Sequence, residues 1–254
     1  MQVKALKWYE SLSTRKGRKE TGCFLVEGFR SVEWILQHFR DDVQEIVAVE
    51  GTADIGFNHQ RWLTEAQFKK ISQVKTPQGI AAVVQMPEGI YSDRLPETTG
   101  DRILFLEHVQ DPGNVGSCIR SAAAFGFSGV LMTDQCADPF SPKCVQSTAG
   151  SVLQLWYRRH ANVEDMIQSL KKQGYVLIAT DLGGIEKAQL SEIQDKIILA
   201  LGNEGEGLSE TIRREADLRW KLPMNTHLAE SLNVAACGAI GMYLLSDPVK
   251  SCIN

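Results

Sequence analysis

The chain has 254 residues, of which 43% are hydrophobic and 23% are charged, and its net charge is −4 with an isoelectric point near 5.8. This length accommodates one large or two medium domains. No apolar run approaches the roughly 20 residues that span a bilayer, so the sequence excludes an integral membrane protein and indicates an ordinary globular one.

The N-terminal sequence MQVKALKWYESLST lacks the unbroken apolar stretch of a signal peptide, so we expect a cytoplasmic protein without a membrane partner. The six cysteines form no CxxC pair and have no nearby histidine set, which argues against both a metal site and a disulfide framework. We expect free thiols and no metal.

Residues 1–88 predict a small α/β domain. Apolar periodicity predicts helices at 3–12, 29–39 and 64–72 and strands at 23–27, 44–49 and 79–86. Thr64 and Gln67 have the spacing of a capping box. The first twenty residues carry six basic side chains against two glutamates, a local charge of +4 that fits either a solvated helix face or an RNA contact.

A domain boundary follows. The segment PEGIYSDRLPETTGD contains two prolines and two glycines with little apolar periodicity, which is typical of a linker. We place the linker at 89–101 and a second domain at 102–254.

The second domain predicts a parallel sheet covered by helices, because strand and helix patterns alternate. Strands are expected at 102–109, 129–133, 175–182, 196–202 and 218–223, and helices at 114–125, 142–149, 162–173, 209–216 and 231–245.

The first segment with candidate functional residues is HVQDPGNVGSCIRSAAAFGF, a strand end followed by a turn and a helix. Ligands in open parallel sheets bind beyond the carboxyl ends of strands, where this turn lies. Asn114 is expected to cap the helix. Arg120 is the one charged side chain in a helix of small and apolar residues, which favours a role in a site over surface decoration.

The second segment is LALGNEGEGLSE, a strand that enters a glycine-rich turn before a helix capped by Ser209. It lacks the GK[ST] of a Walker motif and the GxGxxG of a dinucleotide fold. Glu204 in this turn suits a cationic or hydroxyl-bearing ligand better than a phosphate.

The third segment is LPMNTHLAESLNVAACGAIGMYLL, a strand, a polar loop and an apolar helix. Ser231 and Asn233 lie near the helix start, where capping and a functional role are equally plausible. The helix is rich in alanine and glycine, so it is either buried or part of a dimer face.

Taken in order, the three segments resemble the signature of the SpoU/TrmH family within the SPOUT methyltransferases. The first is similar to N-x-G-x-x-x-R, the second to G-N-E-G-x-G-L, and the third to P-M followed by S-L-N-V. Ala235 departs from the family, whose members often have a serine there. Residues 1–86 resemble the ribosomal-protein-like substrate-recognition domain of many members.

The resemblance implies a trefoil knot in the C-terminal domain, a homodimer, and S-adenosylmethionine as methyl donor for an RNA ribose 2′-hydroxyl. It implies a catalytic set of Arg120, Asn114, Glu204, Ser231 and Asn233. The donor would contact Thr180, Gly202, Leu222, Met224 and Leu232. The candidates for RNA contacts in the first domain are Arg15, Lys16, Arg18, Lys19 and Arg30.

The extra N-terminal domain favours large-subunit ribosomal RNA as the substrate. Transfer RNA is the alternative within the same fold, and a non-catalytic RNA-binding or ribosome-assembly protein is the alternative outside enzymes. A nucleotide-dependent oxidoreductase is disfavoured because the glycine spacing and acidic ribose ligand of that fold are missing.

Overall fold

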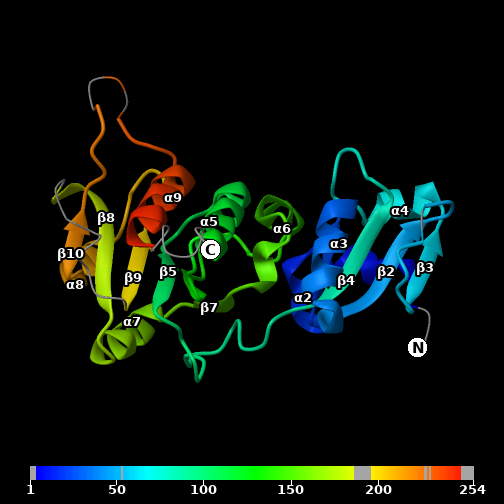
Figure 1. Ribbon diagram of the computed structural model, residues 1–254, viewed down its shortest axis with the longest axis horizontal. Helices are drawn as coiled ribbons and strands as arrows, with labels where there is room; N and C mark the ends of the chain where they lie inside the picture. The colour runs from blue at the N-terminus through cyan, green and yellow to red at the C-terminus, as the bar shows by residue number, and fades with distance from the viewer. Residues whose placement is uncertain (1–3, 53, 186–195, 226–227, 229, 247–254) are drawn as a thin grey trace, which may run out of the picture. The chain divides into compact units, whose positions relative to one another are not determined.

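The computed structural model describes residues 4–52, 54–185, 196–225, 228 and 230–246. The chain divides into two compact units, Met1–Pro87 with Asp138–Leu153, and Glu88–Ala137 with Gln154–Asn254. Each unit contains its own sheet (Figure 1). No helix in the described part of the chain is long and apolar enough to cross a membrane.

The first unit is built on a four-stranded sheet in the order β1-β4-β2-β3. Its strands are β1 (Cys23–Glu27), β2 (Val43–Val49), β3 (Gln60–Leu63) and β4 (Ile80–Gln85). Strand β4 is antiparallel to both of its neighbours, whereas β2 and β3 are parallel. Three of these strands match the sequence expectation, and β3 was not predicted.

The helices of this sheet are α1 (Leu6–Ser11), α2 (Arg15–Thr21), α3 (Phe29–His38), the 3₁₀ turn η1 (Arg40–Asp42) and α4 (Glu65–Ile71). The capping box is confirmed, because Thr64 accepts from the Gln67 amide and the Gln67 side chain accepts from the Thr64 amide. Helix α2 was not predicted, since a run of basic residues carries no apolar period.

Residues 138–153 belong to the first unit, although the sequence placed them in the second domain. Helix α6 (Pro142–Thr148) packs against β1 and is followed by the 3₁₀ turn η2 (Ser151–Leu153). The Phe24 and Phe140 rings meet edge to face at 5.0 Å. Such pairings between residues more than a hundred positions apart leave no local signal in the sequence.

The second unit contains a six-stranded sheet in the order β10-β8-β9-β5-β6-β7, in which every recorded pairing is parallel. The strands are β5 (Arg102–Leu106), β6 (Gly129–Thr133), β7 (Trp156–His160), β8 (Val176–Ile185), β9 (Ile197–Leu201) and β10 (Leu218–Trp220). The predicted parallel sheet is confirmed, and β7 is an additional strand.

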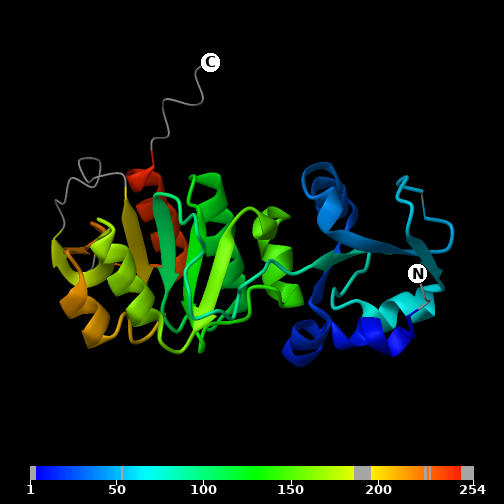
Figure 2. The ribbon, with the colours of Figure 1, turned by 90° about the horizontal axis from the view of Figure 1, so that it is seen from below.

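Helices lie on both sides of this sheet (Figure 2). They are α5 (Pro112–Ala124), α7 (Val163–Lys172), α8 (Glu210–Glu215) and α9 (Val234–Leu245). Helices α7 and α8 pack on the face that carries Phe105 and Ala200. Helix α9 packs on the opposite face, where Gly238 and Gly241 lie against Leu201 and Leu199, and it also contacts α5.

Helix α5 begins at Pro112, not at or after Asn114 as expected. Asp111 is the N-cap, and its side chain accepts from the Asn114 amide at 3.0 Å. Proline is favoured in the first helical turn because its missing N–H has no intrahelical partner there. The expected capping role of Asn114 is therefore wrong, and its side chain is available for other contacts.

The segment before β5 packs along the second unit. The Arg159 amide donates to the Ile90 carbonyl at 2.7 Å, and the Trp156 indole donates to the Thr99 carbonyl at 2.9 Å. Ile90 is buried. Residues 89–101, which the sequence indicates as a linker, therefore have fixed contacts within this unit.

Candidate active site

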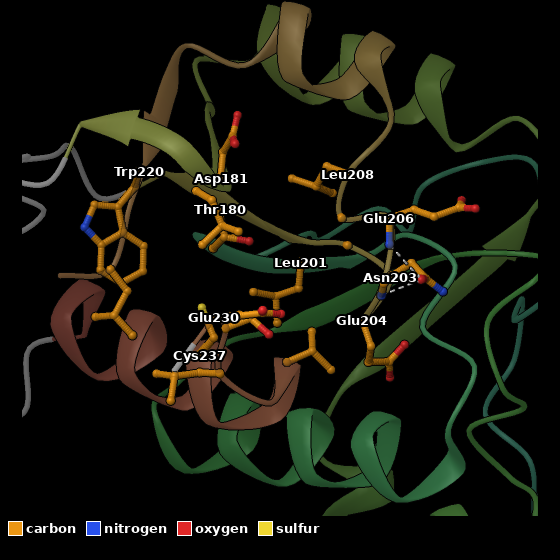
Figure 3. A pocket seen from close by; sticks show the side chains of 18 of the residues that line it. Thr180, Asp181, Leu201, Asn203, Glu204, Glu206, Leu208, Trp220, Glu230 and Cys237 are labelled. Atoms are coloured by element: carbon orange, nitrogen blue, oxygen red, sulfur yellow. Dashed lines mark hydrogen bonds between the residues drawn. The ribbon is translucent and has the colours of Figure 1, made fainter. Parts of the chain in front are cut away.

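Residues of the second and third sequence segments line a cavity of about 520 Å³ at one edge of the six-stranded sheet (Figure 3). The first segment lies beside it, because Asn114 is hydrogen-bonded to Glu204 and Asn233. The carboxyl ends of parallel strands meet at the same edge of a sheet, so residues of β8 lie there with the described residues that follow β9 and β10. The residues that line the cavity are at positions 180–182, 201–208, 213, 220, 222, 224, 230–232, 234 and 237.

The glycine-rich turn forms one wall of the cavity. Asn203 and Gly207 pair as an isolated antiparallel bridge, and Gly207 has a φ of 72°, which favours glycine. A side chain at Gly202 would place its Cβ 2.2 Å from the Gly207 carbonyl carbon. Glycine at 202 is therefore required for the turn to close on itself.

The turn is fixed to the end of β5 by two polar side chains. Asn203 Nδ2 donates to the His108 carbonyl at 2.9 Å, while its Oδ1 accepts from the Gly205 amide at 2.8 Å. The buried Glu107 carboxylate accepts from the Ser209 amide at 2.7 Å. Ser209 caps α8, as the sequence predicts. The first and second segments are thus joined through hydrogen bonds.

A hydrogen-bond chain joins one predicted catalytic residue from each of the three segments. Asn114 Nδ2 donates to Glu204 Oε1 at 2.7 Å, and Asn114 Oδ1 accepts from Asn233 Nδ2 at 2.9 Å. Asn233 also caps α9, because its Oδ1 accepts from the Ala235 and Ala236 amides. The two roles weighed for Asn233, capping and a contact within the site, are both present.

Arg120 is not part of this hydrogen-bond chain. It is exposed on α5, does not line the cavity, and makes no hydrogen bond or ion pair with any residue that the structure describes. Glu204 contacts Asn114 and not the guanidinium. The side chain of Arg120 is therefore available to a ligand outside the cavity.

All five residues expected at the methyl donor line the cavity: Thr180, Gly202, Leu222, Met224 and Leu232. Ser231 lines it as well and is exposed. Thr180 donates its hydroxyl hydrogen to the Ala200 carbonyl at 2.9 Å, so its side chain is oriented by the neighbouring strand.

The lining also includes residues that sequence reasoning missed, among them Asp181, Arg213 and Trp220. Burial by itself raises the pKa of Asp181, but the Gly183 amide and the Arg219 guanidinium outweigh it and hold that pKa below its usual range. Asp181 lies within the predicted strand at 175–182 and within β8, so its position gave no signal of a site. Trp220 lies within a strand and gave none.

The basic residues proposed for RNA contacts differ in exposure. Arg15, Lys16, Lys19 and Arg30 are exposed. Arg18 is 2% exposed, pairs with Asp138 at 2.6 Å and donates to the Leu12 carbonyl at 2.8 Å. The expectation that Arg18 binds RNA is therefore wrong, because its guanidinium holds residues 138–153 to α2.

The cavity fits S-adenosylmethionine in size and in chemistry. Its volume lies within the usual range of roughly 300–1,000 Å³ for small-molecule sites. Leu201, Leu208 and Met224 offer apolar contacts, and the backbone of the glycine-rich turn is open to a close approach. The carboxylates of Asp181, Glu204, Glu206 and Glu230 complement a sulfonium and an ammonium group.

Comparisons with known proteins agree with this site. The family model of the SpoU rRNA Methylase family matches residues 101–243, and that of an MRM3-like substrate binding domain matches residues 2–82. The chain is 34% identical over 244 residues to the 23S rRNA (guanosine(2553)-2′-O)-methyltransferase RlmP of Bacillus subtilis, covering 94% of this chain and 95% of the relative.

Two similarities involve Streptomyces viridochromogenes. Its 23S rRNA (uridine(2479)-2′-O)-methyltransferase is 28% identical over 252 residues, covering 93% of this chain and 86% of that enzyme. The crystal structure of its SpoU methyltransferase AviRb with AdoMet superposes with a TM-score of 0.82 at 25% identity, covering 96% and 97% of the two chains. The chain therefore belongs to the SpoU rRNA Methylase family and is an RNA 2′-O-methyltransferase that uses S-adenosylmethionine.

Proposed function

We propose that this protein methylates a ribose 2′-hydroxyl of 23S ribosomal RNA in the cytoplasm. The observation that carries the proposal is the hydrogen-bond chain from Glu204 through Asn114 to Asn233 beside the cavity. The two relatives that are named for 23S RNA match this protein across both of its units, which supports large-subunit ribosomal RNA over transfer RNA as the substrate. An intact polar chain also argues against a non-catalytic scaffold, for which these side chains would have no use.

S-adenosylmethionine supplies a methyl group on a positively charged sulfur. Backbone groups of Gly202 and Leu208 would hold it, and Thr180, Leu222 and Met224 would exclude water around it. Holding two reactants in line lowers a barrier by about 7–11 kcal/mol in the best cases. The Glu204 carboxylate, fixed by Asn114, places a negative charge at the mouth of the cavity and orients the carboxamide of Asn114 toward the ribose.

Arg120 binds an RNA phosphate next to the reacting ribose and stabilises the alkoxide that forms as the 2′-hydroxyl loses its proton. A guanidinium with a pKa above about 12 is a poor base, so the phosphate or solvent accepts that proton. The exposure of Arg120 supports this role, because the RNA must reach it from outside. The planar guanidinium can hold two phosphate oxygens at once, which an ammonium cannot.

The functional protein is a homodimer that pairs through α9. Ile240, Tyr243 and Leu244 are 38%, 51% and 42% exposed and lie on one side of that helix. Large apolar side chains gathered on one helix face favour association with another protein surface. An Ile240→Asp variant is expected to sediment as a monomer where the wild type sediments as a dimer, and a monomeric wild type would refute the pairing.

The test of the activity uses purified protein with radiolabelled S-adenosylmethionine and separate pools of unmodified 23S, 16S and transfer RNA. We expect label in 23S RNA as 2′-O-methylribose, and loss of that label in Arg120→Ala. Arg120→Lys is expected to stay impaired by about tenfold or more, the effect of one lost charge-assisted hydrogen bond. Labelling of transfer RNA alone would refute 23S RNA as the substrate. Donor binding without transfer to any pool would point to an assembly intermediate as the substrate, and no donor binding at all would favour the non-catalytic alternative.

A further inference from the structure

Helix α3 in the first unit has an exposed face that the methyl-transfer site does not use. Val32 and Ile35 are buried against the sheet, and β1 and β4 both contact this helix. On the outer side, Arg30, Trp34 and His38 follow one another at intervals of four residues, and all three are exposed. Side chains four residues apart are neighbours on a helix surface, so the three form one stripe.

The Trp34 indole is held in place although it is 40% exposed. The His38 ring stacks on it, with ring centroids 3.8 Å apart and planes inclined by 25°. His38 Nδ1 is bonded to the Trp34 carbonyl at 2.8 Å, which fixes the imidazole. An aromatic pair fixed in this way loses little conformational entropy when a further ring stacks on it.

Gly150 holds the indole from another side. A Cβ at Gly150 would lie 2.6 Å from Trp34 Cδ1, and the φ of Gly150 is 94°. The five-membered edge of the indole therefore packs directly on glycine backbone. This contact with Gly150 restrains the indole, whereas a tryptophan side chain surrounded only by solvent would be free to rotate.

We propose that Arg30, Trp34 and His38 form a stacking site for an unpaired base of the substrate RNA. The proposal rests on the RNA-methylating function above and names where that substrate is read. Proteins recognise RNA sequence mainly at unpaired bases, which stack on aromatic rings while arginine contacts the phosphate or the base. The helix lies within the region that matches a substrate binding domain.

The partner is a nucleotide and not a protein surface, because the stripe combines a cation with two π faces. An apolar partner would gain nothing from Arg30, whereas a nucleotide offers both a flat ring and a phosphate. The two 23S-specific relatives methylate different nucleotides, a guanosine and a uridine. Selection of the target nucleotide therefore requires residues outside the shared methyl-transfer site, and the stripe of Arg30, Trp34 and His38 provides such residues.

The experiment compares Trp34→Ala with Trp62→Ala in the full-length protein. Trp62 is a matched control, since it is 41% exposed on β3 of the same unit. Removing a base–aromatic stack costs about 1–3 kcal/mol, so Trp34→Ala is expected to raise the KM for 23S RNA by about 5- to 140-fold. Its kcat at saturating RNA and its affinity for S-adenosylmethionine should not change.

Two further measurements separate a binding role from a folding role. Trp34→Phe keeps a ring against Gly150 and is expected to retain most of the RNA affinity. Single-stranded polyuridylate should compete with 23S RNA for the wild type better than a fully paired duplex, and Trp34→Ala should abolish that preference. Equal KM values for Trp34→Ala and Trp62→Ala would overturn the stacking site.

The outcomes also distinguish this inference from the proposed function. RNA binding that depends on Trp34, without methyl transfer to any RNA, would support the stacking site and refute the proposed activity. Methylation of 23S RNA that is indifferent to Trp34 would support the activity and refute the stacking site.

Discussion

The hydrogen bond between Asn114 and Glu204 can be removed by Asn114→Asp, which preserves the shape of the side chain. In the wild type, Asn114 donates to Glu204 at 2.7 Å and accepts from Asn233 at 2.9 Å. An aspartate keeps the second bond, loses the first and sets two carboxylates against each other. The lost bond to a charged group costs about 1.5 kcal/mol, the lower end of the range, because the contact is exposed.

Repulsion between the two carboxylates adds to this loss. Unit charges about 4 Å apart in water repel by about 1 kcal/mol. The sum of about 2.5 kcal/mol corresponds to a decrease of about 70-fold in kcat/KM. We expect this decrease in a methylation assay with 23S RNA and radiolabelled donor, while the circular dichroism spectrum stays that of the wild type.

A second change tests whether the pair acts as a unit. Adding Glu204→Gln to Asn114→Asp restores a donor opposite an acceptor, because the new carboxamide at position 204 can donate to the new carboxylate at position 114. We expect the double variant to be at least about tenfold more active than Asn114→Asp. If the losses of the two single variants simply multiply in the double variant, the two side chains are not coupled and the reasoning fails.

Three other predictions concern the cavity and its surroundings. Gly202→Ala should weaken S-adenosylmethionine binding by calorimetry by about tenfold or more, because the added Cβ lies 2.2 Å from the Gly207 carbonyl carbon; unchanged affinity would show that the turn can open freely. Burial raises the pKa of the Cys118 thiol to about 12, so a thiol reagent at about pH 8 should label Cys118 only after unfolding; rapid labelling of the folded protein would contradict this. Asp181→Asn should lower the free energy of unfolding near pH 7, and the difference from wild type should shrink below about pH 4, because a carboxyl with a depressed pKa stabilises the fold only while ionised; a difference that stays constant from pH 7 to pH 3 would contradict the ion pair with Arg219.

Local signals predicted most elements, and long-range contacts explain those that were missed. The capping box of Thr64 and Gln67 involves neighbours in sequence and was predicted. Strand β7 was missed because Arg158 and Arg159 do not resemble core residues. Both are nevertheless buried, since carbonyl oxygens of Arg94 and Cys136 accept from their guanidinium groups.

Arg18 shows that long-range contacts also limit the prediction of functional residues from the sequence. A basic cluster near the N-terminus predicts RNA contacts equally for each of its members, because sequence reports charge and not burial. The partner of Arg18 is Asp138, 120 residues further along the chain. The trefoil knot stays a prediction for a related reason, because apolar periodicity by itself indicates an ordinary unthreaded sheet.

The sequence predicted which residues belong to the site but not which of their side chains are hydrogen-bonded to one another. Loops after parallel strands converge at one sheet edge, which brings the segments around Asn114, Glu204 and Asn233 together whatever their separation in sequence. Which side chain bonds to which depends on positions that no spacing gives. The shift of the α5 start from Asn114 to Pro112 moves Asn114 inside the helix and turns its carboxamide to Glu204. Asn233 can cap α9 and bind Asn114 at once because a carboxamide has an acceptor and donors at opposite ends. An aspartate would serve the cap alone, because a carboxylate has no donor, so the need for both contacts explains why asparagine and not aspartate stands at this helix start.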